Sequence, residues 1–125
     1  MLFRSDMPGL MLCLDASYQA EGPGGARSLS ARSYYEAAFF TALAEDEVLT
    51  EIRIPVPAAG HGYAYEKMKR KVGDYATAAA AVILQMEGET CRQASIALTN
   101  VGQTPLHAEA AAEALAGRQI GRAHV

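Results

Sequence analysis

The sequence predicts an α+β fold in which antiparallel hairpins are combined with short helices. Two observations support this prediction. Segments in which apolar and polar residues alternate occur in pairs around short turns that contain glycine, a pattern typical of β-hairpins. Segments with helix-start signals, each led by a proline, lie near the two ends of the chain.

Length and composition exclude several classes of protein. The chain has 125 residues, a formal net charge of −3 and a hydrophobic content of 50%, which is too apolar for a disordered tail. No apolar run could span a bilayer, and the N-terminal residues lack the plan of a signal peptide. The slight acidic excess argues against a general nucleic-acid-binding protein. Two distant cysteines, Cys13 and Cys91, cannot form a disulfide framework, so we expect a cytoplasmic protein.

The two ends of the chain do not continue the patterns beside them. Residues 2–5 and 120–125 are what a common short-read sequencing adapter would encode when read in opposite orientations, and a CAG codon for Gln119 fits the same adapter. We therefore expect both ends to be adapter artefacts, which are left out of fold reasoning. Residues 6–119 would then be a natural segment that is truncated at both ends.

The first elements expected are a helix and a hairpin. Pro8 can open a short helix, because its missing N–H is not needed in the first turn. The apolar face of that helix would consist of Leu10, Met11, Cys13 and Leu14. Segments 16–20 and 26–31 flank a cluster of glycine and proline at 22–25, which predicts a hairpin.

A second short helix is expected next. Ser33 can cap it, and Glu36 lies at the spacing of a capping box. This helix would carry four aromatic residues, namely Tyr34, Tyr35, Phe39 and Phe40.

Residues 48–54 then predict a strand. Ile52 and Ile54 would share one of its faces because side chains alternate along a strand. Pro55 and Pro57 end it, since proline cannot donate a hydrogen bond to a neighbouring strand.

The second half of the chain predicts a further strand, a hairpin and a helix. Residues 63–69 alternate, and they place Tyr63, Tyr65, Lys67 and Lys69 on one side. Segments 76–86 and 91–101 flank a short turn with glycine, which favours a hairpin although alanine favours helix. A helix is expected over residues 105–115, with Thr104 as N-cap, Pro105 in the first position and Gly117 at the C-terminal cap.

Few residues have the spacing of a known catalytic or metal site. His61 and His107 have no further ligand nearby, and no nucleophile elbow, Walker loop or Gly-x-Gly-x-x-Gly motif occurs. The remaining candidate is segment 67–75, in which four cations are followed by Gly-Asp-Tyr. It could hold an anionic or electron-rich ligand, or it could be a solvated face. Tyr75 could cover a planar cofactor, or it could be a core or rim tyrosine.

Several motifs along the chain resemble, in order and spacing, a known family. They are Asp6-Met7-Pro8, Tyr34-Tyr35, the segment 49–55, the segment 60–67, Lys69-Arg70-Lys71, Gly73-Asp74-Tyr75-Ala76 and Leu98-Thr99-Asn100-Val101. Together they resemble the FAD-binding medium subunits of aerobic carbon monoxide dehydrogenases, in the xanthine dehydrogenase superfamily of molybdenum hydroxylases. The resemblance implies that residues 6–57 end an FAD-binding domain. It also implies that residues 60–119 begin the C-terminal domain of the flavoprotein, an antiparallel three-stranded sheet with packed helices.

The resemblance also implies a function. Such a subunit holds FAD, receives electrons from a small subunit with [2Fe–2S] clusters and passes them to an external acceptor such as a quinone. Oxidation of CO occurs in a large subunit that carries the molybdenum cofactor. The implied assembly is a dimer of heterotrimers without nucleic acid or a transmembrane segment. It would be cytoplasmic, either free or at the inner face of the cytoplasmic membrane. The alternative is a non-catalytic docking module, with Lys69-Arg70-Lys71 as the docking patch.

Four residues are implied to contact the flavin. Asp6 matches the aspartate that binds the ribityl chain, and Leu49 matches an apolar residue against the flavin. Lys67 matches the lysine of a Tyr-x-Lys motif near the isoalloxazine, and Tyr75 matches an aromatic residue that covers one face of the ring. No residue is implied to be catalytic or to bind a metal. The two glycine-rich loops that bind the diphosphate lie upstream of Asp6 in the family, so we expect the isolated chain to bind FAD weakly or not at all.

Overall fold

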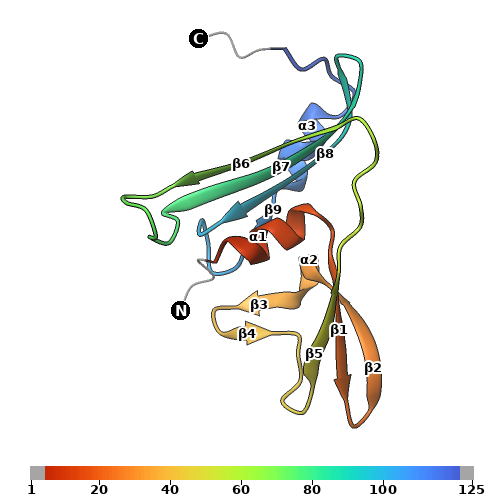
Figure 1. Ribbon diagram of the computed structural model, residues 1–125, viewed down its shortest axis with the longest axis vertical. Coiled ribbons are helices and arrows are strands. Elements are labelled where there is room, and N and C mark those ends of the chain that lie inside the picture. Colours follow the sequence, from red (N-terminus) through yellow and green to blue (C-terminus); the bar gives the residue numbers. More distant parts are fainter. Residues whose placement is uncertain (1–4, 122–125) are drawn as a thin grey trace.

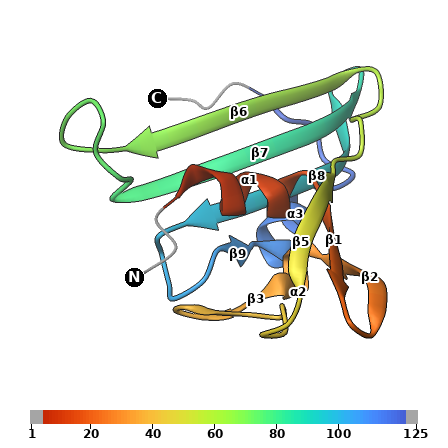
Figure 2. The same ribbon diagram turned by 60° about the horizontal axis from the view of Figure 1, so that its bottom comes forward.

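Residues 5–121 are described by a computed structural model (Figure 1). The expected adapter-derived ends lie largely outside these residues, because 1–4 and 122–125 are not described. The fold is α+β, as predicted, and it contains a three-stranded sheet, a small two-stranded sheet and a four-stranded sheet. The first helix, α1 (Asp6–Cys13), packs against the four-stranded sheet (Figure 2).

The three-stranded sheet is antiparallel in the order β2-β1-β5. Its strands are β1 (Ser17–Gly22), β2 (Gly25–Ser30) and β5 (Val48–Arg53). The predicted hairpin and the predicted strand are both confirmed. Gly25 has a φ of +107°, a conformation that glycine adopts without a steric cost, at the turn between β1 and β2.

The predicted aromatic helix is wrong. In this part of the chain the helix α2 (Ala31–Tyr34) ends before the predicted helix would. A small hairpin follows it, formed by β3 (Tyr35–Ala37) and β4 (Phe40–Thr41). The cap is Ser30 and not Ser33, since the Ser30 hydroxyl accepts a hydrogen bond from the Arg32 N–H at 3.3 Å. Phe39 has a φ of +67°, which an α-helix cannot contain, and aromatic residues favour strands.

The second half of the chain forms a four-stranded antiparallel sheet in the order β6-β7-β8-β9. The strands are β6 (His61–Met68), β7 (Ala78–Glu87), β8 (Thr90–Thr99) and β9 (Leu106–His107). The predicted strand and hairpin are confirmed as the three long strands β6, β7 and β8, and the two-residue strand β9 adds a fourth strand to the sheet. The last helix, α3 (Glu109–Leu115), packs on β8.

The start of the last helix differs from the prediction. The helix begins at Glu109 rather than Pro105, because the intervening residues pair with β8, Leu98 opposite Leu106. Thr104 is therefore not the N-cap; Ala108 occupies that position without a side-chain cap. Gly117 follows the helix with a φ of +76°, as expected of a glycine at a C-terminal cap.

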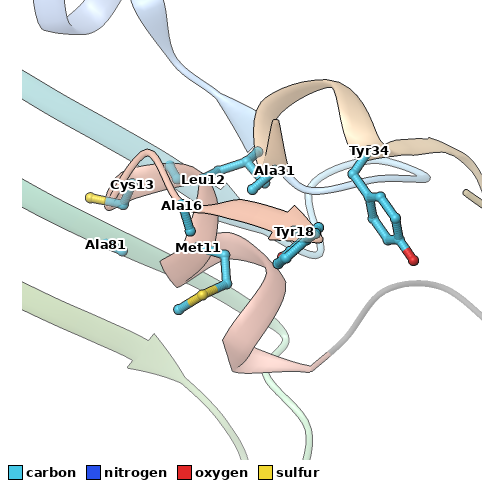
Figure 3. Close-up of a cluster of buried hydrophobic side chains, with 9 residues drawn as sticks. Met11, Leu12, Cys13, Ala16, Tyr18, Ala31, Tyr34 and Ala81 are labelled. Carbon is cyan, nitrogen blue, oxygen red and sulfur yellow. The ribbon is translucent and has the colours of Figure 1, made fainter. Parts of the chain in front are cut away.

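The main hydrophobic core surrounds α1 (Figure 3). Its buried residues are Met11, Leu12, Cys13, Ala16, Tyr18, Ala31, Tyr34, Ala81 and Ala97. Ala81 and Ala97 lie opposite one another on β7 and β8. Their short side chains let the helix approach the sheet closely. Among residues 5–121, no helix is long and apolar enough to cross a membrane.

Candidate functional site

The N-terminal end of α1 meets the C-terminal end of β6. Asp6 Oδ2 accepts a hydrogen bond from Lys67 Nζ at 3.0 Å, and the two groups form an ion pair. Asp6, Gly9 and Cys13 are spaced by three and four residues, so they share one face of the helix. That face is directed at the sheet, where Cys13 exchanges hydrogen bonds with Ser95 of β8. The structure therefore brings together two of the four predicted site residues, Asp6 and Lys67.

Tyr65 is a third polar group at this end of the helix. It shares a face of β6 with Lys67, because the two residues are two positions apart. Burial raises the pKa of Tyr65 to about 12, with a further contribution from the Asp6 carboxylate. The phenol therefore stays protonated at neutral pH and can donate to a carboxylate.

The Asp6 carboxylate is held in its charged form. Burial alone would raise the pKa of Asp6, but the hydrogen bond from Lys67, the nearby Tyr65 hydroxyl and the positive charges of Lys67 and Lys69 lower it below its ordinary value. One carboxylate oxygen, Oδ1, is buried and has no well-formed hydrogen bond to any of residues 5–121. An ionised carboxylate only accepts hydrogen bonds, so Oδ1 suits a ligand that brings hydroxyl groups.

Leu49 lies in a hollow beside the same helix end. The hollow is lined by Met7 and Met11 of α1, by Tyr18, Tyr34 and Tyr35, and by Leu49 and Ile52 of β5. The three tyrosine rings pack edge to face at centroid distances of 4.7, 5.1 and 6.3 Å. Ser5 and Met7 also line the hollow, so it borders the residues on both sides of Asp6.

A β-bulge sets the direction of Leu49. Gln19 of β1 lies opposite Glu51, but the next residue, Ala20, lies opposite Leu49, so Thr50 has no partner in the ladder. The extra residue places Leu49 on the same side as Ile52, although regular alternation would put them on opposite faces.

Tyr75 lies apart from the other candidates, in the connection between β6 and β7. It is 65% exposed and borders a hollow with Arg70, Asp74 and Asn100. No interaction of Tyr75 with Asp6, Leu49 or Lys67 is present. In Figures 1 and 2, however, this connection and the start of α1 lie at the same end of the four-stranded sheet.

Sequence reasoning missed several residues of this region. Tyr65 could have been found, since the alternation of residues 63–69 already placed it beside Lys67. The bulge at Thr50 and the pair formed by the Tyr18 and Tyr35 hydroxyls, 2.7 Å apart, have no comparable signal in the sequence. Within residues 5–121 no three metal-ligating side chains come together, and both cysteines are free thiols.

The arrangement suits a ligand with a polyol chain and a planar ring. Asp6 Oδ1 offers a buried acceptor for a hydroxyl group, and Lys67 offers a cation beside it. The hollow at Leu49 offers an apolar and aromatic wall. Riboflavin-type cofactors combine these features, so the residues present fit FAD.

Comparisons with known proteins agree with this fit. Residues 2–57 match a family described as FAD binding domain in molybdopterin dehydrogenase, and residues 63–125 match the CO dehydrogenase flavoprotein C-terminal domain. The chain is 60% identical to the carbon monoxide dehydrogenase medium chain of Afipia carboxidovorans over 118 residues, which are 94% of this chain and 41% of that protein. It is 43% identical to the medium chain from Hydrogenophaga pseudoflava, covering 91% of this chain and 40% of that one.

Solved structures give the same result. The crystal structure of a Cu,Mo-CO dehydrogenase in a cyanide-inactivated form matches with a TM-score of 0.91 and 61% identity over 94% of this chain and 41% of that one. The carbon monoxide dehydrogenase from Hydrogenophaga pseudoflava matches with a TM-score of 0.93 and 45% identity, over 97% of this chain and 42% of that one. The chain thus spans about 40% of the length of the relatives it matches.

Proposed function

The chain belongs to the family of CO dehydrogenase flavoprotein C-terminal domains, preceded by part of an FAD-binding domain, and from this we propose that it is a segment of the FAD-binding subunit of a molybdenum hydroxylase. The parent enzyme we propose is an aerobic carbon monoxide dehydrogenase, because both medium chains described above belong to carbon monoxide dehydrogenases. Residues 6–57 would end the FAD-binding domain and residues 60–119 would begin the C-terminal domain.

The observation that carries the proposal is the buried, unsatisfied Asp6 Oδ1 next to Lys67. Asp6 would accept hydrogen bonds from the ribityl hydroxyls, and Lys67 would favour an anionic, reduced flavin. Leu49 would contact the flavin from the tyrosine-lined hollow, and Tyr75 would cover one face of the ring. FAD itself supplies the redox chemistry, while the protein binds and orients it.

The role of the parent subunit would be electron transfer rather than activation of a substrate. We propose that its partners are a small iron–sulfur subunit and a large molybdenum subunit in a dimer of heterotrimers. Electrons would pass from the iron–sulfur clusters through FAD to an external acceptor. The family membership supports this role.

The proposal can be tested in a grafted subunit, in which residues 6–119 replace the corresponding segment of the Afipia carboxidovorans medium chain. We expect this subunit to bind about one FAD in the assembled enzyme. The substitution Tyr75→Ala should change the rate of flavin reoxidation by about tenfold, because one face of the ring loses its cover, while far-UV circular dichroism stays unchanged.

Stopped-flow absorbance would measure the reoxidation of the reduced grafted enzyme. Phe39→Ala is the matched control, since Phe39 is an aromatic residue that is 75% exposed and lies outside the site. A grafted subunit without FAD would refute the proposed function. Identical reoxidation with and without the Tyr75 ring would remove Tyr75 from the site.

A second candidate function is docking of a neighbouring subunit. Lys69, Arg70 and Lys71 are all exposed, and none of the ion pairs found within residues 5–121 includes them. Three unpaired cations in one loop would attract an acidic partner surface. Replacing all three by glutamine in the grafted subunit separates the two functions. Loss of assembly with normal FAD content would favour docking, and normal assembly with reduced FAD content would favour the flavin role.

A further inference from the structure

Two adjacent residues at the end of β8 contact the two segments that carry Asp6 and Tyr75. The side chain of Thr99 is 2% exposed and lies beneath α1, where a β-carbon added to Gly9 would overlap Thr99 Oγ1. Gly9 is one helical turn after Asp6, so the two share a helix face. Thr99 therefore sets how closely the helix that bears Asp6 approaches the sheet.

The next residue, Asn100, holds the other segment. Its side-chain amide Nδ2 donates hydrogen bonds to the carbonyl oxygens of Ala76 at 3.0 Å and Thr77 at 3.1 Å. Ala76 directly follows Tyr75 and is 2% exposed. Asn100 has a φ of +60°, which asparagine tolerates better than most residues. The amide thus ties down the C-terminal end of the β6–β7 connection just behind Tyr75.

Other contacts do not fix Tyr75 in the same way. The Thr77 N–H donates to the Met68 carbonyl at 2.8 Å, and the Asp74 N–H donates to the Lys71 carbonyl at 3.2 Å. The first bond closes the connection onto β6, and the second lies within the connection. Among the hydrogen bonds of residues 5–121, only those of the Asn100 amide join residues 69–77 to the chain directly after β8.

We propose that Thr99 and Asn100 are positioning residues that hold the helix bearing Asp6 and the connection bearing Tyr75 at a set separation around the flavin. The inference rests on the proposed flavin site. Neither residue would touch the cofactor; Thr99 acts through Gly9, and Asn100 acts through the backbone that follows Tyr75. The motif Leu98-Thr99-Asn100-Val101 would then be a structural link between two parts of one site.

Hydrogen exchange tests the link directly. In the grafted subunit, Asn100→Gly keeps a residue that accepts a positive φ but removes the amide. We expect the backbone amides of residues 73–77 to exchange about tenfold faster. Asp15→Gly is the matched control, because Asp15 also has a positive φ, 55°, and lies outside the site. Unchanged exchange in Asn100→Gly, or an equal change in the control, would overturn the proposed role of Asn100.

Flavin reactivity tests whether the link acts through Tyr75. We expect Asn100→Gly to retain one FAD per subunit, and to shift the reoxidation rate and the visible circular dichroism of the flavin in the same direction as Tyr75→Ala. Combining the two substitutions should add nothing, since both remove the same cover. Additive effects would overturn the inference. A grafted subunit that lacks FAD before any substitution would refute the proposed function instead, and the exchange comparison would still decide the role of Asn100.

Discussion

Gly9→Ala is expected to destabilise the grafted subunit by about 1–3 kcal/mol, the usual cost of overpacking. A β-carbon at position 9 would overlap Thr99 Oγ1, and the sheet beneath cannot yield because Thr99 is buried. In an unobstructed helix, the same change would stabilise by about 0.5–1 kcal/mol, since alanine has the higher helix propensity. The sign of the effect therefore reports how closely α1 packs on β8.

The substitution Thr99→Ala should reverse that sign. It removes Oγ1 and leaves the β-carbon of residue 99, which lies 3.5 Å from the added atom, an ordinary contact. In this background, Gly9→Ala should stabilise by up to about 1 kcal/mol. Urea unfolding followed by far-UV circular dichroism would measure all four proteins of the cycle. Gly62→Ala is the control, because a β-carbon there meets no atom within 4 Å. A neutral or stabilising Gly9→Ala in the parent background would contradict the close packing.

Asp6→Ala is expected to weaken FAD binding by about 10- to 100-fold in the grafted subunit. A hydrogen bond to a charged group contributes about 1.5–3 kcal/mol, which corresponds to that change in the dissociation constant. The substitution also leaves Lys67 without its partner at 3.0 Å. Flavin fluorescence titration of the apoprotein would measure the affinity.

The matched control for Asp6 is Glu87→Ala. Glu87 also forms an ion pair, with Arg92 at 3.1 Å. Glu87 is the last residue of β7, and about 30 Å of strand separates it from the first residue, Ala78, which pairs with Met68. Removing the Glu87 side chain should leave the affinity for FAD unchanged.

The effect of Asp6→Ala should not depend on pH near neutrality. The pKa of Asp6 is lowered in the fold, so the carboxylate is ionised at every pH above its ordinary pKa of about 3.9, and it loses its charge only as the pH falls through the lowered pKa. The affinity difference should therefore be constant between about pH 6 and 8. Equal affinities of the parent and Asp6→Ala would remove Asp6 from the site.

Local patterns predicted most of the strands correctly. The alternation of residues 63–69 and the glycine turn between the two following segments correspond to β6, β7 and β8. The alanines of β7 have a high helix propensity. However, β7 pairs with β6 on one side and with β8 on the other, so its backbone hydrogen bonds are formed within the sheet. The same local reasoning failed at residues 33–40 and at Pro105. In both places a neighbouring strand or ring cluster, and not the capping signal, determines the backbone.

The candidate site shows the same division. The motif series along the chain singled out Asp6, Leu49, Lys67 and Tyr75 as residues to examine, through a family resemblance that the comparisons then established. The ion pair between Asp6 and Lys67 joins residues 61 positions apart, and no spacing rule relates them. Tyr65 was already placed beside Lys67 by alternation, because a strand has a fixed period of two.

The sequence by itself determined the fold class, the positions of the long strands and the family, because alternation, turn residues and motifs are local properties of the chain. Only the tertiary structure decided that Gly9 lies against Thr99, that Asn100 ties the segment after Tyr75, and that Leu49 shares a side with Ile52. For Leu49, the physical reason is that a single unpaired residue, Thr50, reverses the alternation of β5. Whether a strand contains such a bulge depends on its partner strand, which local sequence does not specify.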